Sequence, residues 1–345
     1  MNKPNKSPPF RAEHVGSLLR PNELKAAFRD AAQGKLDQVA FNEIQDRCIR
    51  DAIAMQESVG LEVITDGEFR RGSWFYGFVQ AVDGLTTKDA IFDFHDSSGT
   101  RATFQAPYVT APIRRTRGIA TEEFAFVRAA TSRTPKVTMP TPSCMHFFRG
   151  NDSVSRDAYR HMEDFWNDLF AVYRNEIVAL AALGCNYVQL DEVAIAMLCD
   201  PKIRDAVGAA GLDPARLLET YVSAINLCVA AKPAGMTIGL HLCKGNYKGH
   251  WMAEGSYEAV SEQLFGETDV DVYFLEYESE RAGGFEPLDT LRRRVDEATK
   301  YVALEQLGVS PQCGFASSVG GNPLSLDDER RKLARVVELA HAVWG

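Results

Sequence analysis

The sequence has no long apolar segment and no concentration of positive charge. No window approaches the roughly 18 to 20 consecutive apolar residues that a membrane helix needs, and the N-terminus lacks the apolar core of a secretion signal. The 38 Lys and Arg residues are outnumbered by 47 Asp and Glu, which gives a net charge of -9. The sequence has no basic stripe of the kind that neutralises the phosphate backbone of a nucleic acid. We therefore expect a cytoplasmic protein that neither spans a membrane nor binds nucleic acid.

Cysteine pairs and interdomain linkers are also missing. The seven cysteines are odd in number, widely scattered and mostly set in apolar runs, which argues against a disulfide framework and predicts that most are inert buried thiols. No Pro/Gly/Ser-rich linker or repeat divides the 345 residues, and 45% of them are hydrophobic. The sequence predicts one domain over residues 1–345, with its own core.

Short apolar runs alternate with long amphipathic stretches, the pattern of βα units around a parallel sheet. The predicted strands are Glu13–Ser17, Glu62–Thr65, Val137–Pro140, Tyr187–Asp191, Thr237–Leu242, Val270–Glu276 and Leu307–Ser310. The predicted helices cover residues 38–59, 156–183, 213–232, 288–303 and 326–343. Caps or first-turn acids are expected at Asp157, Asp213 and Asp327. Residues 83–115 change to short β-prone pieces, which predicts a hairpin inserted after the second strand as a lid or rim.

Such alternation fits either an open doubly wound sheet or a closed (β/α)8 TIM barrel. The only glycine after the first predicted strand is Gly16, in HVGSLLRP, so the glycine-rich nucleotide fingerprint is absent. Metal-capable residues follow many different strands, which favours the barrel, because an open sheet gathers its site near one switch point.

Four side chains at the ends of three predicted strands form a candidate metal site. His241 and Cys243 are two residues apart, and positions i and i+2 of a strand face the same side. A buried histidine beside a buried cysteine is the alternative. Glu276 and Cys313 end the next two predicted strands, and together the four make the number of ligands that tetrahedral zinc takes.

These residues carry a resemblance. HLCKGN, FLEYESERAGGFEPL and SPQCGFASSVGGNPL resemble the zinc motifs of the cobalamin-independent methionine synthase family, in its short, single-barrel branch. HVGSLLRP, ITDGEFRRGSWF and QLDE match in the family's order, from residue 14 onward. The synthases transfer a methyl group from 5-methyltetrahydrofolate to homocysteine on a (β/α)8 barrel.

The resemblance implies roles for individual residues. It implies that His241, Cys243, Glu276 and Cys313 bind Zn2+. We expect an incoming thiolate to displace Glu276, because a carboxylate oxygen is the hardest donor of the four. The resemblance also implies that Ser17 holds the carboxylate of the thiol substrate, and that Glu68 and Asp191 hold its ammonium group. From the residues alone, Ser17 reads as a turn residue and the two acids as solvated strand ends.

Other candidates are less specific. Asp191 and Glu192 are neighbours on a strand, so only one can face the site. His14 is a candidate substrate contact or proton carrier, and equally a structural histidine. The aromatic residues of the run from Trp74 to Phe78 either wall a ligand pocket or simply pack.

The match departs from the family in three places. The chain has only the catalytic half of the full-length synthases, and VTMPTPSCMHFF lacks the tryptophan that those synthases place against the pterin, leaving Phe147 or Phe148 as substitutes. Only 36 residues separate Glu276 from Cys313, too few for two crossover helices and a seventh strand. We therefore expect a barrel that is incomplete around the seventh strand, or a sequence that lacks a segment.

The sequence leaves three candidate functions. The first is a zinc-dependent methyltransferase that converts homocysteine to methionine, with a folate, methylcobalamin or another methylated compound as donor. The second is alkyl transfer to another thiol, as in the epoxyalkane:coenzyme M transferases, although acids at Glu68 and Asp191 disfavour a sulfonate. The third is a non-catalytic zinc-binding protein. The oligomeric state stays open, a homo-oligomer included.

Overall fold

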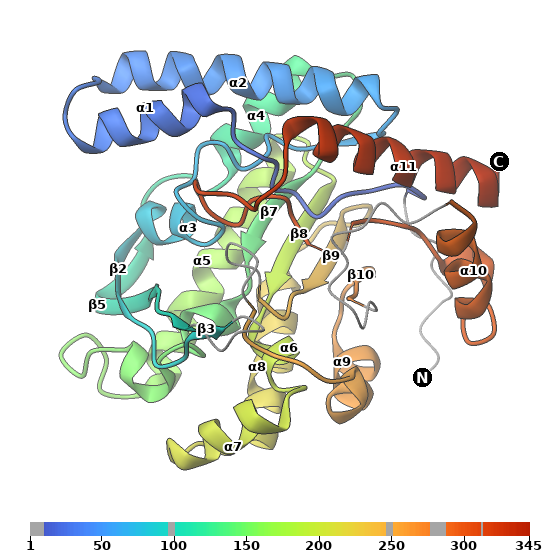
Figure 1. Ribbon diagram of the computed structural model, residues 1–345. Coiled ribbons are helices and arrows are strands. Elements are labelled where there is room, and N and C mark those ends of the chain that lie inside the picture. The colour runs from blue at the N-terminus through green and yellow to red at the C-terminus, as the bar shows by residue number, and fades with distance from the viewer. Residues whose placement is uncertain (1–9, 96–100, 246–250, 277–287, 312) are drawn as a thin grey trace.

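A parallel sheet forms the centre of the protein. The structure is a computed structural model that describes residues 10–95, 101–245, 251–276, 288–311 and 313–345. Four strands pair in the order β10-β9-β8-β7, and β1 pairs in parallel with β6, which directly precedes β7 (Figure 1). The strands are β1 Val63–Ile64, β2 Val82–Asp89, β3 Phe94–His95, β4 Arg101–Ala102, β5 Gln105–Arg115, β6 Thr134–Pro135, β7 Val137–Pro140, β8 Tyr187–Glu192, β9 Thr237–Leu242 and β10 Val272–Phe274.

Helices surround this sheet and bury its two cores. Helices α1, α2 and α11 lie together at one end of the molecule (Figure 1) and share a core with β1. Helices α5 and α8 share the larger core with β7, β8 and β9. The helices are α1 Asn22–Ala32, α2 Gln38–Ser58, α3 Tyr76–Ala81, α4 Thr121–Ala130, α5 Met162–Ala182, α6 Ala194–Met197, α7 Pro201–Ala209, α8 Pro214–Val229, α9 Ser261–Glu267, α10 Leu288–Ala298 and α11 Leu326–Trp344. No helix in the described parts of the chain is long and apolar enough to cross a membrane.

Two of the three acids predicted at helix starts, Asp213 and Asp327, are confirmed. Asp213 caps α8 by accepting a hydrogen bond from the N–H of Ala215, and Asp327 lies in the first turn of α11. The prediction at Asp157 is wrong, because α5 begins only at Met162. The preceding residues bind β5 instead, as the N–H of Ser155 donates to the carbonyl of Val109.

Two predicted strands are wrong, and among the described residues the sheet does not close into a barrel. Glu13–Ser17 and Leu307–Ser310 meet only through one parallel bridge, between Ala12 and Val309. No strand is present among the described residues between β10 and Val309, where α10 and a short 3-10 turn lie. Residues 277–287, which hold part of the predicted zinc motif, lie outside the described part of the chain.

Side chains take the place of a strand neighbour along Glu13–Ser17. The ammonium of Lys136 donates to the carbonyl of His14 at 2.6 Å, and the amide of Gln189 donates to the carbonyl of Val15 at 2.7 Å. Because buried carbonyl groups need hydrogen-bond donors, these contacts satisfy a backbone that no neighbouring strand pairs. The segment therefore enters the centre of the fold without joining its sheet.

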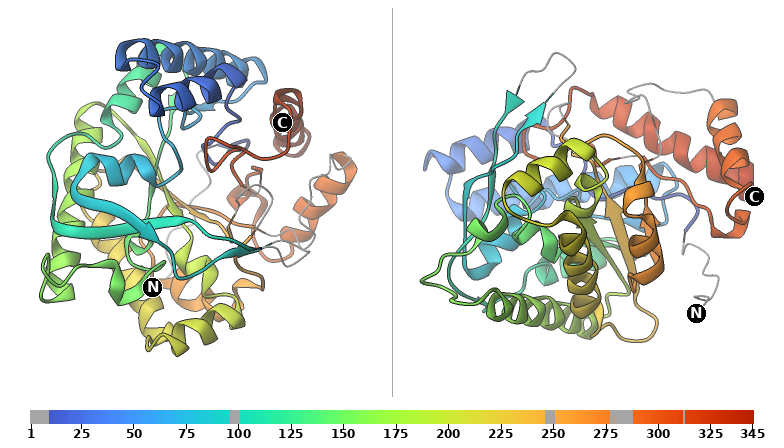
Figure 2. Two further views of the ribbon diagram at one scale, coloured as in Figure 1. Left: turned by 60° about the vertical axis from the view of Figure 1, so that its left-hand side comes forward. Right: turned by 90° about the horizontal axis from the view of Figure 1, so that it is seen from below.

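An antiparallel pair occupies the region predicted as an inserted hairpin. Strands β2 and β5 pair from Val82 with Arg115 to Asp89 with Gln105, with an irregularity after Asp83. The pair crosses one side of the molecule (Figure 2). Whether this hairpin acts as a lid, and where domain boundaries fall, stay predictions.

Candidate metal and substrate site

The residues predicted to bind zinc come together from distant parts of the chain. His241 lies near the end of β9, Cys243 directly follows this strand, and Cys313 follows the segment that bridges to Ala12. One ligand atom from each of His241, Cys243 and Cys313 lies within 4.8 Å of the others. The two sulfur atoms are 3.7 Å apart. Tetrahedral zinc, with bonds of about 2.3 Å to each sulfur, would separate them by about 3.8 Å.

The hydrogen bonds of His241 leave one ring nitrogen available for a metal. Nδ1 lies 3.1 Å from Oδ1 of Asp191, while Nε2 is buried and has no hydrogen-bond partner. Histidine ligands usually donate their other N–H to a carboxylate, which fixes the ring and its tautomer. Gln189 in turn donates to the same Asp191 oxygen at 2.8 Å. The donor set and the unpaired nitrogen both fit a zinc ion.

Glu276 lies beside this cluster of three. Its Oε1 accepts hydrogen bonds from the thiol of Cys313 at 3.0 Å and from the N–H of Lys244 at 3.2 Å. Its own N–H donates to the hydroxyl of Tyr257 at 3.0 Å. The carboxylate therefore touches one sulfur of the cluster, although it does not belong to the group within 4.8 Å.

Charges around the cluster oppose the effect of burial on the pKa of His241 and add to it on the pKa of Cys313. Burial disfavours the cationic form of His241, but the hydrogen bond and charge of Asp191, with Cys243 and Glu276, raise its pKa to about 8. The hydrogen bond with Cys243, followed by burial, raises the pKa of the Cys313 thiol well above its usual value. Without a cation, this site disfavours further negative charge on Cys313, and a divalent cation would relieve that cost.

All seven cysteines are free thiols, as the sequence predicted, and five of them are fully buried. Burial raises the pKa of Cys185 and of Cys199 to about 11, which keeps both protonated at neutral pH. Only Cys243 and Cys313 are partly accessible. The two predicted ligands are thus distinguished from the structural thiols by exposure as well as by position.

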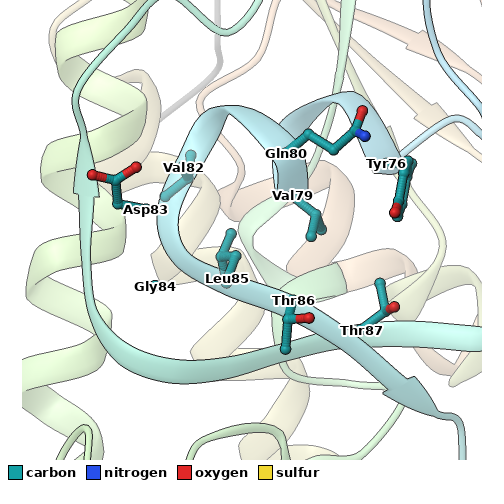
Figure 3. A pocket seen from close by; sticks show the side chains of 9 residues that line it. All are labelled: Tyr76, Val79, Gln80, Val82, Asp83, Gly84, Leu85, Thr86 and Thr87. Carbon is teal, nitrogen blue, oxygen red and sulfur yellow. The ribbon is translucent and has the colours of Figure 1, made fainter.

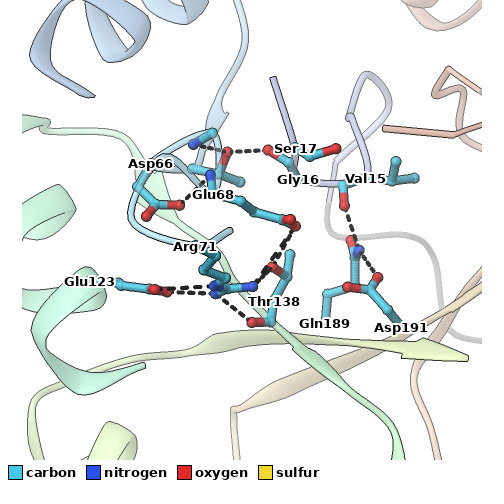
Figure 4. A network of polar contacts seen from close by, with 12 residues as sticks. Val15, Gly16, Ser17, Asp66, Glu68, Arg71, Glu123, Thr138, Gln189 and Asp191 are labelled. Atoms are coloured by element: carbon cyan, nitrogen blue, oxygen red, sulfur yellow. Dashed lines mark hydrogen bonds and ion pairs between the residues drawn. The ribbon is translucent and has the colours of Figure 1, made fainter. Parts of the chain in front are cut away.

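The two acids predicted to hold an ammonium group are buried near one another. Glu68 adopts a φ of +61° and is the sole described residue other than glycine with positive φ. Its Oε1 accepts from the hydroxyl of Thr138 at 2.9 Å, while Oε2 is buried without a partner. Burial raises the pKa of Glu68 to about 7, which Arg71 opposes and the charge of Asp191 reinforces. The carboxylate thus lies between Arg71 and the Gln189–Asp191 pair (Figure 4).

The neighbouring acid on β8 faces elsewhere. Glu192 accepts from the hydroxyl of Ser143 at 2.5 Å and from the N–H of Ile195 at 2.6 Å, at the start of α6. Asp191 instead contacts His241. The alternation expected of a strand therefore assigns Asp191 to the site and Glu192 to a structural role.

Ser17 and His14 are both buried at the centre of the fold. The hydroxyl of Ser17 accepts a hydrogen bond from the N–H of Ala316 at 3.3 Å, close to the Cys313 segment. His14 uses both ring nitrogens within the protein, one with Gln56 at 2.9 Å and one with the N–H of Gly16 at 3.3 Å. These contacts favour the structural interpretation of His14, and its role in proton transfer stays a prediction, as does that of Ser17 in carboxylate binding.

The aromatic candidates pack rather than line a common site. Phe75 and Phe78 are buried in the core. Tyr76 lies at a surface depression of about 380 Å³ beside α3 and β2 (Figure 3). Apart from Tyr76, none of the residues that line this depression is a predicted site residue. Phe147 and Phe148 are also buried, under aromatic side chains of residues 92 and 104.

Three site residues were not found from the sequence. Gln189 lies two residues before Asp191 on the same face of β8, a spacing that identifies it in hindsight. Arg71 follows Glu68 by three residues and binds Glu123 through two hydrogen bonds, of 2.5 and 3.1 Å. Thr138, on β7, has no local signal, because its contact with Glu68 joins residues 70 positions apart.

Comparison with known proteins now identifies the family. A model described as "Cobalamin-independent synthase, Catalytic domain" matches residues 10–340. The chain belongs to this family. YxjG of Bacillus subtilis, a relative without an assigned function, is 36% identical over 98% of this chain and 96% of its own length.

Other family members link the chain to solved structures and to named enzymes. A Listeria monocytogenes protein, provisionally assigned as a vitamin-B12 independent methionine synthase, superimposes with a TM-score of 0.77 at 31% identity, over 99% of this chain and 100% of its own. A methyltransferase of Rhodococcus jostii named for 5-methyltetrahydropteroyltriglutamate and homocysteine is 23% identical over 95% of this chain. The chain spans only 43% of that enzyme's length.

The alignment with YxjG extends over 372 positions, whereas 98% of this 345-residue chain is about 338 residues. In total, about 34 positions therefore have a residue in YxjG and none in this chain.

Proposed function

We propose that the protein is a zinc-dependent methyltransferase that transfers a methyl group from a methyltetrahydrofolate-type donor to homocysteine, forming methionine. The observation that carries this proposal is the unpaired, buried Nε2 of His241 beside the sulfurs of Cys243 and Cys313. A buried polar atom without a partner is costly, and a ligand that binds there removes the cost.

His241, Cys243, Cys313 and the adjacent Glu276 would hold the metal. A free alkyl thiol has a pKa of about 8.5 and is mostly protonated at neutral pH. Zinc held by these residues would lower the pKa of the substrate thiol and leave its sulfur nucleophilic. Two thiolates and a carboxylate in the protein shell suit a sulfur nucleophile better than the histidine-rich shells that activate water.

The chain's own acids would orient the acceptor. The free Oε2 of Glu68 and the nearby Asp191 present negative charge to the ammonium group of homocysteine, with Ser17 at its carboxylate. A thiol that carries a sulfonate would be repelled by the same pair. Holding the sulfur and the methyl group in line then supplies much of the rate enhancement.

The reaction balances without an oxidant or reductant. The sulfur of homocysteine forms a bond to the methyl carbon, and the bond from that carbon to the donor's nitrogen breaks with its electron pair left on nitrogen. The proton lost by the thiol ends on the donor. The curated enzyme of Rhodococcus jostii is named for this pair of substrates.

Zinc content and methionine formation test the proposal. The protein should bind one zinc per chain, and C243S and C313S should each lose both zinc and methyl transfer. C48S, which alters a thiol on α2 outside the site, is the matched control and should keep both. Calorimetry with homocysteine should show binding only when zinc is present. A chain that binds no stoichiometric zinc, or cysteine variants that still form methionine, would contradict the proposal.

A donor screen separates the methionine assignment from the wider enzyme class. Folate monoglutamate, folate polyglutamate and methylcobalamin are each offered with homocysteine, and methionine is measured. If zinc binds but every donor fails, thiol alkyl transfer survives and the methionine assignment does not. If zinc binds but homocysteine does not, the acceptor is wrong.

A further inference from the structure

Thr138 lies where it can determine the position of Glu68. Its side chain is buried on β7, and its hydroxyl donates to Oε1 of Glu68 at 2.9 Å. The same hydroxyl lies 2.9 Å from Nη1 of Arg71. Because a guanidinium can only donate, the threonine oxygen accepts from Arg71 and has its single hydrogen left for Glu68. We propose that Thr138 is a positioning residue that keeps Glu68 turned toward the ammonium group of the substrate.

Arg71 is itself held away from Glu68. Its guanidinium binds Glu123 through two nitrogens and also donates to the carbonyl of Thr138 at 2.7 Å. The separation between Arg71 Nη1 and Glu68 Oε1 is 3.9 Å, too long for a direct hydrogen bond. Glu123 thus offsets the charge of Arg71, and the threonine hydroxyl bridges Arg71 Nη1 and Glu68 Oε1 through two hydrogen bonds, beside their longer ion-pair contact (Figure 4).

Gly16 leaves room for the contact between Thr138 and Glu68, because it has no side chain. A Cβ on Gly16 would lie 2.6 Å from the methyl group of Thr138 and 3.0 Å from Oε1 of Glu68. Gly16 also has a φ of +120°, which other residues rarely adopt. The close approach packs the Thr138–Glu68 pair against the first segment of the chain.

Loss of the hydroxyl has a definite consequence. Valine has the shape of threonine but can neither accept from Arg71 nor donate to Glu68. The carboxylate of Glu68 would then rotate toward Nη1 of Arg71 and shorten their 3.9 Å ion-pair contact into a direct, hydrogen-bonded ion pair. An ion-paired Glu68 would attract an ammonium group less strongly.

Binding of two thiols tests this inference, which rests on the proposed function. Homocysteine and 4-sulfanylbutanoate differ only in the amino group, so the ratio of their dissociation constants reports on the ammonium contact. Calorimetry on the zinc-loaded protein should show that T138V lowers this preference for homocysteine about tenfold, since a hydrogen bond to a charged group is worth roughly that much. T138S, which keeps the hydroxyl, should stay within about twofold of the original protein.

The controls separate three outcomes. A general loss of structure in T138V would weaken both thiols equally and leave the ratio unchanged, which would overturn the inference, as would a T138S ratio that falls as far as that of T138V. An unaltered protein that binds neither thiol would refute the proposed function instead. An unaltered protein that prefers homocysteine, with the preference lost in E68Q and T138V but kept in T138S, supports both.

Discussion

Glu329 should make the protein less stable as the pH rises through neutrality. This residue lies in the first turn of α11, is only 2% exposed, and accepts a hydrogen bond from the N–H of Leu19 at 2.6 Å. Burial raises its pKa from 4.5 to about 8, against the opposing effect of that hydrogen bond. In the unfolded chain the same carboxyl has its ordinary pKa.

The sign and size of the effect follow from these two pKa values. Below pH 4.5 the carboxyl is neutral in both states, and its contribution to stability is complete. Between pH 4.5 and about 8 only the unfolded chain loses the proton, so unfolding becomes easier as the pH rises. Each pKa unit corresponds to about 1.4 kcal/mol, which makes the upper limit of the loss about 5 kcal/mol.

E329Q removes the titration while keeping a neutral group of the same shape. We expect this variant to match the original protein near pH 4 and to be more stable by about 3 to 5 kcal/mol at pH 9, since the amide never ionises. Urea unfolding at half-unit pH steps measures the difference. E338Q, which alters an exposed carboxylate on the same helix, is the control and should change little. A stability difference between E329Q and the original protein that does not vary with pH would refute the reasoning.

Three further predictions concern buried contacts. K136M should lower the free energy of unfolding by about 3 to 5 kcal/mol, because it leaves Glu13 buried without the cation that lies 3.1 Å away; urea unfolding measures this, and a loss below about 1 kcal/mol would contradict it. D191N should weaken zinc binding about 10- to 100-fold by disturbing the ring of His241, as read from competition with a chelator, and unchanged affinity would rule out this support. G84A should destabilise the hairpin by about 1 to 3 kcal/mol, because Gly84 has a φ of +87° and a Cβ there would lie 2.5 Å from a facing carbonyl. An unchanged melting temperature would show that the backbone relaxes there.

The family resemblance could be recognised and the main strands predicted from the sequence, because both depend on short motifs within single segments. Strands β7, β8 and β9 are short runs rich in β-branched and apolar residues, and they are buried along nearly their whole length, as expected of strands covered on both faces. The two predicted strands that were wrong, Glu13–Ser17 and Leu307–Ser310, are also short segments between turn residues, yet a strand needs a neighbour. The segments near Glu13 and Val309 have only each other, through one bridge. Periodicity along one segment contains no information about whether a partner is present.

The metal site was easier to predict than the residues that support it. A histidine and a cysteine two residues apart have a spacing with a chemical meaning, as does a cysteine within a Pro- and Gly-rich segment. Thr138 has no such signature, and Gln189 has only its two-residue spacing to Asp191, because both act through hydrogen bonds to Glu68 and Asp191 rather than through a recognisable motif. Such contacts depend on the register of neighbouring strands.

The sequence by itself determined the parallel α/β pattern, the free thiols, the absence of a nucleotide fingerprint and the identity of the candidate zinc ligands, because each depends on residue type and on spacing along one segment. Tertiary structure alone decided that Nε2 of His241 is left without a partner, that the sulfurs of Cys243 and Cys313 lie 3.7 Å apart, and that Glu68 has one free oxygen. These properties depend on distances between residues up to 72 positions apart along the chain, from His241 to Cys313, and such distances exist only after the chain has packed.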